Sequence, residues 1–422
     1  MAPILQLKVF FVALQVLHGV HVQASVLVKS QALSNTIPIT RHTAAGSRPR
    51  NVVQLDRSRI NDIKSRVGIT SASLSAAERL AVNNAPLNAT NDGLFYSAIV
   101  HIGASNTPFN FIVDTGSGNT WIGGNKTYVP SSTSIKTADM FNISYGMGFA
   151  AGDQYLDQVT LGTFTISNQS IGVASTFSGV TWGCDGILGL GPTTLTKNTL
   201  TTSGYSTIPT VPDNLHSQGK IAVQSFGVYF QPATSASVTD GELCFGEVDT
   251  SKITGPMTYA ALSTTVPAAY YWSFSQSIQY GSTSMLANGT GIVDTGSSLI
   301  YVATDAFNVY KTATGAQTDP TTGFLEITAA QYATLQDISF VVNGTTFTLT
   351  PNAQLWPRSL NALIKGVASS YYLVFQDTGA PSGSGFDFIM GYAFLERFYS
   401  YYDTTNSRMG FATTSFSNAT TN

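Results

Sequence analysis

The chain has 422 residues, of which 43% are hydrophobic, 11% aromatic and only 10% charged. A helical bundle carries many charged residues on its wet faces, so this composition argues against one and favours an all-β protein with a Ser/Thr/Asn/Gly surface. Two cysteines and five histidines argue against a Cys/His zinc site. The net charge of residues 25–84 is +6, whereas that of residues 85–422 is −10. The acidic body would repel phosphates, so we expect no nucleic-acid partner.

Residues 1–24 have the pattern of a secretory signal peptide. Lys8 supplies the positive end, an apolar run from Val9 to Val20 follows, and Val22-Gln23-Ala24 offers a small-residue cleavage site. The alternative is a buried strand or a short helix. Beyond it, no apolar stretch reaches the roughly 18 residues needed to span a bilayer, and the C-terminus has no hydrophobic tail. We therefore expect no membrane anchor.

Residues 25–84 form a basic arm ahead of the acidic body. Arg57, Arg59, Lys64 and Arg66 are closely spaced, and residues 73–80 could form a helix. The arm is either a solvated linker or a pro-segment that lies on the body by charge complementarity. The preceding signal favours a pro-segment that is cut off near Leu80 to Ala85 as falling pH neutralises the body's carboxylates.

From about residue 85, short alternating apolar runs are separated by Gly, Asn, Ser and Pro. This spacing predicts many short strands, for example over 109–113, 158–166, 257–261 and 337–349. Two short helices are predicted, over 305–313 and over 329–335, the second capped by Thr328. Seven Asn-x-Ser/Thr sequons fit a chain that passes through the secretory pathway. They begin at Asn142 and at the six glycosylation candidates Asn88, Asn125, Asn168, Asn288, Asn343 and Asn418.

An internal repeat is the most informative feature of the sequence. Ile-Val-Asp-Thr-Gly-Ser occurs at 112–117 and again at 292–297. Each copy is followed, 75 and 97 residues later, by an apolar-apolar-Gly unit, at 187–189 and at 389–391. Two ordered elements that recur in the same order predict two homologous lobes related by a pseudo-twofold axis.

The repeated motif places one acidic group in each predicted lobe. A buried strand carries its terminal Asp into the protein, Gly permits close backbone approach, and Thr and Ser can hold the carboxylate by hydrogen bonds. If the lobes meet about a twofold, Asp114 and Asp294 face each other. Two carboxylates about 3 Å apart share one proton, and can bind and deprotonate a water that attacks a peptide carbonyl. This chemistry needs no metal and no cofactor.

Here the sequence resembles the pepsin-like aspartic proteases, and among them the fungal polyporopepsin-type enzymes. The resemblance covers essentially residues 85–422 and includes the stretches 293–296, 356–358 and 394–400. It implies an all-β, bilobal fold of two β-barrel-like lobes around a central cleft, with a few short helices. The implied organisation is a signal peptide at 1–24, a pro-segment at 25–84, an N-terminal lobe at 85–253 and a C-terminal lobe at 254–422. The implied catalytic groups are Asp114 and Asp294, supported by Thr115, Gly116, Ser117, Thr295, Gly296 and Ser297.

The resemblance also implies a flap over the cleft, at residues 143–148. Tyr145 would wall the first specificity pocket and bond to Trp121, while Gly146 would supply hairpin flexibility. The alternatives are an ordinary hairpin aromatic and a core tryptophan. A further three residues, Ile112, Ile187 and Ile292, either line an apolar groove that favours cleavage between bulky apolar residues, or simply pack in the core.

Several positions depart from the family pattern. Gly118 stands where many relatives have serine, Met147 replaces a polar flap residue, and Tyr392 stands where an aspartate is frequent. The family places a pro-segment lysine against the aspartate pair, and Lys29 and Lys64 are the candidates. Cys184 and Cys244 would be expected to pair in an oxidising compartment if their Cα atoms lie within about 7 Å.

The combined prediction is a secreted, monomeric aspartic endopeptidase made as a zymogen, with a vacuolar location as the less favoured alternative. Its partners would be polypeptide substrates, its own pro-segment and pepstatin-like inhibitors. A second interpretation is a catalytically silent pepsin-fold protein that binds or inhibits another protein. A third is a glycosidase, whose two carboxyl groups would lie about 5–9 Å apart.

Overall fold

The computed structural model describes residues 35–42, 51–66, 95–146, 148–179, 183–201, 207–232 and 238–422. The predicted signal peptide, the possible helix at 73–80, the expected cleavage region, Lys29, Asn88 and Met147 lie outside these ranges. The described residues all fall within one unit of the chain, Leu33–Asn422.

Within the described ranges, the largest sheet has thirteen strands and joins the two halves of the chain. Its order is β11-β23-β22-β9-β10-β1-β2-β3-β8-β4-β7-β6-β5, with a further pairing of β2 and β6. The strands are β1 (Thr36–His42), β2 (Phe95–Ile102), β3 (Thr107–Asp114), β4 (Trp121–Ile122), β5 (Ile135–Tyr145), β6 (Gly148–Leu161), β7 (Phe164–Ser178), β8 (Gly186–Gly189), β9 (Ser225–Tyr229), β10 (Val238–Phe245), β11 (Thr258–Ala261), β22 (Phe398–Asp403) and β23 (Arg408–Thr413).

Two further sheets belong to the C-terminal half of the described chain. The seven-stranded one has the order β18-β17-β12-β13-β21-β14-β20, and the three-stranded one β15-β16-β19. Their strands are β12 (Ser273–Tyr280), β13 (Thr283–Val293), β14 (Ile300–Val302), β15 (Gln317–Thr318), β16 (Leu325–Ile327), β17 (Ile338–Val342), β18 (Thr345–Leu349), β19 (Tyr371–Leu373), β20 (Phe375–Asp377) and β21 (Phe388–Met390).

The helices are short apart from α1 and α4. They are α1 (Val52–Arg66), α3 (Val211–Ser217), α4 (Thr304–Thr314), α5 (Ala329–Tyr332) and α6 (Tyr392–Leu395), with 3-10 turns η1 (Thr193–Thr196), η2 (Ala268–Tyr270) and η3 (Arg358–Ile364). Both predicted helices are confirmed as α4 and α5, and Thr328 caps α5 by accepting the N–H of Gln331. The strands expected over 109–113 and 257–261 are confirmed as parts of β3 and β11. The runs 158–166 and 337–349 are each not one strand but parts of two strands joined by a turn.

The internal repeat corresponds to one topology used twice. The strand β3 pairs in parallel with β8, which aligns Ile112 with Ile187, and β13 pairs in parallel with β21, which aligns Ile292 with Ile389. In each half a short strand, β4 or β14, then lies antiparallel on the far side of the partner strand. The predicted all-β, two-lobed architecture is therefore confirmed, with one motif in each lobe.

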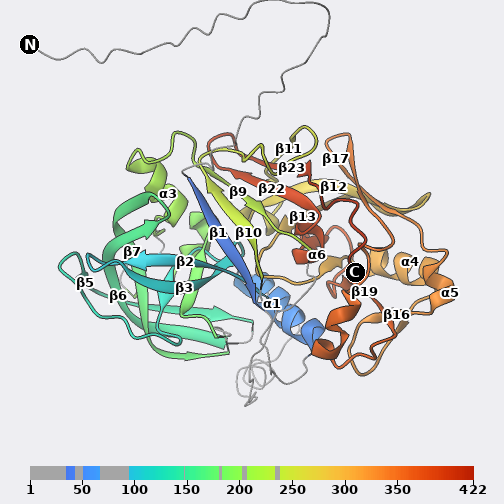
Figure 1. Cartoon of the computed structure of the whole chain (residues 1–422), viewed down its shortest axis with the longest axis horizontal. Helices are drawn as coiled ribbons and strands as arrows, with labels where there is room; N and C mark the ends of the chain where they lie inside the picture. The colour runs from blue at the N-terminus through green and yellow to red at the C-terminus, as the bar shows by residue number, and fades with distance from the viewer. Residues whose placement is uncertain are drawn as a thin grey trace, which may run out of the picture. The chain divides into compact units, whose positions relative to one another are not determined.

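The N-terminal segment contributes two elements that lie against the rest of the chain. The strand β1 is inserted between β10 and β2 and pairs antiparallel with both, so it lies inside the large sheet and not at its edge. Figure 1 shows β1 in the middle of the molecule and α1 beneath it. Four apolar side chains of α1 are buried, namely Val52, Val53, Ile60 and Ile63.

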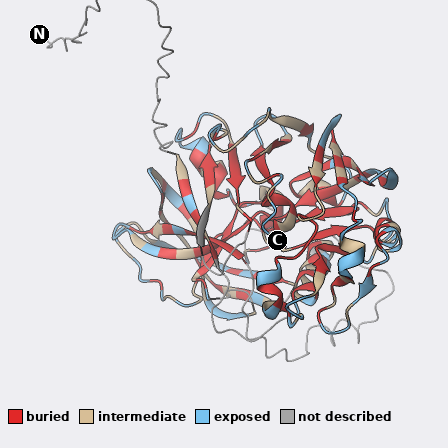
Figure 2. Cartoon of the chain, turned by 45° about the vertical axis from the view of Figure 1, so that its right-hand side comes forward, coloured by how far each residue is buried: buried red, intermediate tan, exposed pale blue. Residues whose placement is uncertain are grey.

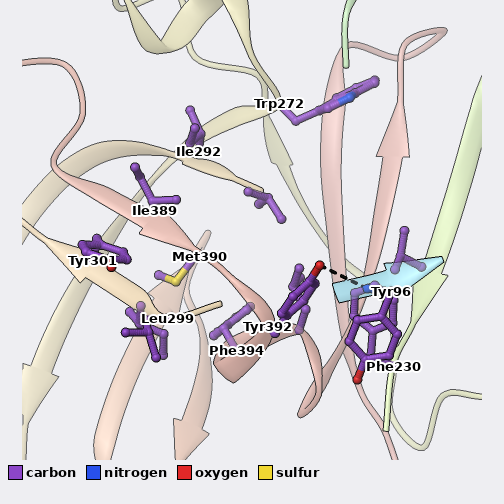
Figure 3. Packing of buried hydrophobic residues seen from close by; sticks show 14 of the residues in the cluster. Tyr96, Phe230, Trp272, Ile292, Leu299, Tyr301, Ile389, Met390, Tyr392 and Phe394 are labelled. Atoms are coloured by element: carbon purple, nitrogen blue, oxygen red, sulfur yellow. Dashed lines mark hydrogen bonds between the residues drawn. The ribbon is translucent and has the colours of Figure 1, made fainter. Parts of the chain in front are cut away.

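Buried residues are concentrated in the strands of both halves of the chain (Figure 2). The aromatic side chains Tyr96, Phe230 and Tyr392 pack where the halves meet, and Figure 3 shows them beside the core residues of β21 and α6. The rings of Tyr96 and Phe230 stack with centroids 3.7 Å apart. This shared core fixes the strand ends that carry the two motifs.

The predicted disulfide is wrong, because Cys184 and Cys244 are both free and buried. Cys244 lies on β10, whereas Cys184 lies two residues before β8, and β1, β2 and β3 separate these strands in the sheet. At about 4.8 Å per strand spacing the separation along the sheet is roughly 19 Å, well beyond the reach of a disulfide.

Candidate active site

The two repeated motifs bring a pair of buried carboxyl groups together at the ends of β3 and β13. Asp114 is the last residue of β3, and Asp294 directly follows β13; they are 1% and 0% exposed. Each parallel strand pair holds its own aspartate in register, because Asp114 lies opposite Gly189 and the N–H of Asp294 donates to Met390 O at 3.0 Å. The sequence correctly placed both groups.

Each aspartate is held by the same two donors from its own motif. The outer oxygen Oδ2 accepts a hydroxyl hydrogen bond, from Ser117 to Asp114 at 2.5 Å and from Ser297 to Asp294 at 2.6 Å. The inner oxygen Oδ1 accepts a backbone N–H, from Gly116 at 2.9 Å in the first motif and from Gly296 at 3.0 Å in the second. These charge-assisted bonds fix both carboxylates in single orientations.

The two threonines join the motifs across the twofold axis. Thr115 Oγ1 donates to Val293 O at 3.2 Å, and Thr295 Oγ1 donates to Val113 O at 3.0 Å. Each hydroxyl also accepts the other threonine's N–H at 3.0 Å. This closed set of four bonds satisfies every buried group involved and sets the distance between the strands.

Glycine is required beside each aspartate because the facing groups approach the backbone closely. A Cβ at Gly116 would lie 2.6 Å from Asp294 Oδ1, and a Cβ at Gly296 would lie 2.2 Å from Arg59 Nη2. Neither position has room for any other side chain while Arg59 is in place.

Arg59 of α1 occupies the space between the two carboxylates. Its Nη2 donates to Asp294 Oδ1 at 2.8 Å and also to Asp114 Oδ1, while its Nε donates to Asp294 Oδ2 at 2.6 Å. A single nitrogen atom therefore touches the inner oxygens of both aspartates. Burial by itself would raise the pKa of Asp294, but the Arg59 charge and the donors around it outweigh burial and lower this pKa below its usual value.

The position that the resemblance assigned to a lysine is thus taken by an arginine. Lys64 lies elsewhere on α1, and its Nζ donates to Thr378 O at 2.7 Å. Asp56, Arg59 and Ile63 share one face of the helix, at the spacings i, i+3 and i+7. Asp56 Oδ2 accepts the N–H groups of Ser298 and Leu299 at 3.0 and 3.1 Å.

Asp56 is a second buried ionisable group at this interface. Burial raises its pKa to about 7, although the two backbone donors and Arg59 act in the opposite direction. The sequence analysis missed both Asp56 and the role of Arg59. The sequence pattern that could have revealed them is the spacing of Asp56 and Arg59, which places them on the same helix face as Ile60 and Ile63. Both isoleucines are buried.

The strands β5 and β6 pair antiparallel up to Tyr145 and Gly148, so a hairpin lies at the residues expected to form the flap. Trp121 Nε1 donates to Tyr145 Oη at 2.7 Å, which places the predicted pair in direct contact. The backbone of α1 abuts the hairpin, since a Cβ at Gly146 would lie 1.9 Å from Ser58 O. The hairpin tip and α1 therefore cannot come closer together.

Beneath the hairpin lies a separate apolar group that we call the hairpin cluster. It consists of Phe95, Ile112, Trp121, Phe141, Ile143, Tyr145, Ala150, Cys184 and Ile187. Two of the three predicted groove residues, Ile112 and Ile187, belong to it. Ile292 belongs instead to the main core, and all three residues are at most 4% exposed while the N-terminal segment is in place.

Replacing Tyr145 by Phe should reduce kcat/KM for peptide cleavage by about tenfold, because the buried Trp121 N–H loses its partner and the hairpin loses its positioning bond. The measurement is a double-mutant cycle with Trp121→Phe, in which the coupling between the two substitutions should be about 1 kcal/mol. Strictly additive losses would contradict a role for this hydrogen bond.

The structure shows the surroundings of two positions that depart from the family pattern, Gly118 and Tyr392. A Cβ at Gly118 would lie 2.7 Å from Thr196 Cγ2, so the neighbouring 3-10 turn excludes serine here. Tyr392 opens α6, and its hydroxyl accepts the N–H of Tyr96 at 3.3 Å (Figure 3). Burial raises the pKa of Tyr392 far above its usual range, so it is neutral where a carboxylate would carry charge.

The remaining predictions concern surfaces and ligands. The sequon asparagines at 125, 142, 168, 288, 343 and 418 are all exposed. Among the described residues, no three His, Cys, Asp or Glu side chains are grouped to hold a metal ion. In that same part of the chain, no helix has both the length and the apolar character needed to cross a membrane.

Comparison with known proteins identifies the family. The profile described as "Eukaryotic aspartyl protease" matches residues 95–414. The sequence is 54% identical to polyporopepsin of Irpex lacteus over 79% of this chain and 98% of that protein. The chain belongs to the eukaryotic aspartyl proteases. The crystal structure of the aspartic proteinase from Irpex lacteus superimposes on this protease with a TM-score of 0.76, covering 78% of this chain and 96% of that one.

More distant relatives match three quarters or more of the protease. Mouse cathepsin E is 28% identical over 92% of this chain and 96% of its own. A probable vacuolar protease A of Trichophyton verrucosum is 30% identical over 75% of this chain and 78% of its own. The protease is therefore an aspartic peptidase acting on polypeptides. Because the relatives are proteases, they do not favour a catalytically silent binding protein. Because both carboxylates contact one nitrogen atom, their spacing does not favour a glycosidase.

Proposed function

We propose that the protease hydrolyses peptide bonds at acidic pH through Asp114 and Asp294 acting as an acid–base pair. The observation that carries this proposal is the position of Arg59 Nη2, a single nitrogen bonded to both inner carboxylate oxygens. A nitrogen in this position stands in for the oxygen of a water molecule. The aspartates are thus spaced so that one water can touch both after Arg59 has left.

In the proposed reaction the pair carries one proton and one negative charge. The ionised carboxylate takes a proton from the bound water, whose oxygen attacks the peptide carbonyl carbon. The protonated carboxyl group donates to the carbonyl oxygen, giving a tetrahedral intermediate. A proton is then delivered to the leaving nitrogen as the C–N bond breaks. Ser117 and Ser297 keep the two carboxylates aligned throughout.

The side chains beside the scissile bond are proposed to be bulky and apolar. Ile112, Ile187 and Tyr145 lie together in the hairpin cluster next to the aspartate motif. Burial of apolar surface against such residues contributes roughly 25 cal/mol per Å². The hairpin is proposed to act as the flap that closes over the substrate and excludes water.

Residues 25–84 are proposed to be a pro-segment that keeps the precursor inactive. Both of its described elements are integrated into the protein, β1 within the large sheet and α1 across the aspartate pair. Arg59 occupies the water position directly. Removal of the pro-segment by a cut near Leu80 to Ala85 is proposed to release the active enzyme.

Secretion is proposed from the signal-like residues 1–24 and is supported by the exposure of every described sequon asparagine. A vacuolar destination is the alternative, suggested by the relative named as a probable vacuolar protease A. A monomer without a membrane anchor is the proposed state.

The test is acid proteolysis of a protein substrate such as casein after incubation of the precursor at low pH. Cleavage that pepstatin abolishes is the expected result, with apolar residues on both sides of the cut. No cleavage at any pH after verified removal of the pro-segment would overturn the proposed mechanism.

A further inference from the structure

A buried tryptophan is hydrogen-bonded to both halves of the protein beside the aspartate motifs. Trp272 directly precedes β12 and is 3% exposed. Its indole Nε1 donates to Leu190 O of the N-terminal half at 2.9 Å, and its own carbonyl oxygen accepts the N–H of Val293 of the C-terminal half at 2.9 Å. Trp272 therefore contacts one segment from each half, close to the strand ends that carry Asp114 and Asp294.

These two contacts belong to a closed circuit of hydrogen bonds through both motifs. Leu190 N–H donates to Asp114 O at 2.8 Å, and Thr115 Oγ1 donates to Val293 O at 3.2 Å. Asp114 and Thr115 are consecutive, which closes the circuit, and Val293 directly precedes the second aspartate. All four bonds lie within residues 85–422, so they do not depend on the pro-segment. A displacement of the indole would therefore reach both aspartates.

Aromatic side chains hold the indole in one orientation. Its ring meets the ring of Phe226 edge-on, with centroids 5.8 Å apart at 84°, and the ring of Tyr402 at 5.4 Å and 78°. The Phe226 and Tyr402 rings are stacked, 4.5 Å apart and 8° from parallel, and both residues are 0% exposed. Because protein interiors are close-packed, the indole cannot turn away from Leu190 without displacing these rings.

The pseudo-twofold axis relates Trp272 to Tyr96 in the N-terminal lobe. Each lies one place before the residue that pairs with the isoleucine of its motif. The same axis relates Leu190 to Tyr392, since each follows the glycine of an apolar-apolar-Gly unit. Tyr96 is joined to Tyr392 by its backbone N–H, which donates to the Tyr392 hydroxyl at 3.3 Å (Figure 3). Trp272 thus uses its side chain to make a link for which its mate uses the backbone.

We propose that Trp272 is a positioning residue for hydrolysis, whose indole N–H fixes the separation of Asp114 and Asp294 by tying the two motifs together. This inference rests on the proposed two-carboxylate mechanism. The closer two carboxyl groups are held, the further apart are the two pKa values at which the pair titrates. These values set the two limbs of a bell-shaped pH profile of kcat/KM. Loosening the tie should therefore narrow the bell.

Two substitutions at this position test the proposal. For Trp272→Phe we expect kcat to fall by about tenfold with KM nearly unchanged, because the lost contact acts on the catalytic pair and not on substrate binding. The interval between the two limbs should narrow by about one pH unit, since the acid limb moves up and the other limb moves down. Benzothienylalanine in place of Trp272 replaces only the N–H by sulfur and keeps the ring shape. It should reproduce both changes even if the phenylalanine variant does not fold.

Tyr401→Phe is the matched control. It also removes one buried hydrogen bond, from Tyr401 Oη to Ser225 Oγ at 2.7 Å, and its ring belongs to a separate apolar cluster. This variant should lose a similar free energy of unfolding while its kcat and the width of its bell stay as in the wild type.

The measurements are pH profiles of kcat and kcat/KM for each processed enzyme, together with its urea unfolding. A bell of wild-type width in the benzothienylalanine variant would overturn the role of Trp272, whatever its loss of stability. Equal narrowing in Tyr401→Phe would overturn it too, because the width would then follow general stability. Failure of the proposed mechanism looks different: the wild-type enzyme itself would have no bell-shaped profile, or Asp294→Asn would keep its turnover.

Discussion

Replacing Asp294 by Asn will lower kcat for peptide hydrolysis at acid pH by about 10³- to 10⁴-fold, equivalent to roughly 4–5.5 kcal/mol of transition-state stabilisation. An amide cannot take a proton from water or donate an acidic one, so the acid–base pair is reduced to a single carboxyl group. The measurement is kcat with a peptide substrate after the pro-segment has been removed and its removal verified by mass.

Three further variants serve as controls: Asp114→Asn, the double variant of both aspartates, and a surface substitution. Asp114→Asn should cause a similar loss, and the double variant should lose little more, because groups that act as a unit are not additive. Asp305→Asn is the neutral control, since Asp305 is exposed and bonds to Ser382 at the start of α4. Full turnover by Asp294→Asn would refute the two-carboxylate mechanism.

The sequence was sufficient to predict the aspartate pair because the relevant information is local and duplicated. An apolar strand followed by Asp-Thr-Gly-Ser specifies both the burial of the aspartate and its donors, and the second copy specifies the partner. The same reasoning used the recurring apolar-apolar-Gly units to predict two homologous lobes, and the structure shows these units on strands that pair in parallel with β3 and β13. These predictions needed no knowledge of how the lobes are joined.

Features set by long-range pairing could not be predicted in this way. The insertion of β1 between β10 and β2 joins residues about 60 and 200 positions apart, and no local pattern in 36–42 specifies those partners. The disulfide prediction failed for the same reason. Cys184 and Cys244 are the two cysteines available, but strand order, which the sequence does not show, keeps them apart.

The helix α1 was missed because its face toward the rest of the protein is not uniformly apolar. Asp56 and Arg59 lie at positions where a core-facing helix would carry hydrophobic residues, and they meet the cleft instead of the core. This breaks the periodicity by which amphipathic helices are identified. The basic cluster was noticed, but charge alone did not distinguish Arg59 from the exposed Arg57.

Replacing Arg59 by Gln will open the active site of the precursor. Gln is shorter and neutral, so it cannot bridge two buried carboxylates, and the space between them becomes available to water and inhibitors. We expect pepstatin to bind the uncut Arg59→Gln precursor at least about a hundredfold more tightly than the uncut wild type, a difference of roughly 2.7 kcal/mol. The measurement is calorimetric titration at a pH where neither precursor is processed.

The same substitution should change how docking of the pro-segment depends on pH. Arg59 lowers the pKa of Asp294 below 3.8, so its contribution to docking is fully present above pH 3.8 and is lost as pH falls through the lowered value. The pKa of Asp56 is raised to about 7, so its contribution is present below pH 3.8 and is lost as pH rises toward about 7. Without Arg59, docking of the pro-segment should largely stop weakening as the pH falls below 3.8.

Two matched variants distinguish this electrostatic explanation from a simple loss of packing. Arg59→Lys keeps the charge but not the fork that reaches three carboxylate oxygens, so it should restore part of the inhibition and most of the acid-dependent release. Arg57→Gln removes a neighbouring exposed charge of the same helix and should leave pepstatin binding unchanged. Equal pepstatin affinity for the wild-type and Arg59→Gln precursors would show that α1 blocks the cleft through its other contacts, of the Ser58 backbone with Gly146 and of the Asp56 carboxylate with Ser298, and that the arginine is dispensable.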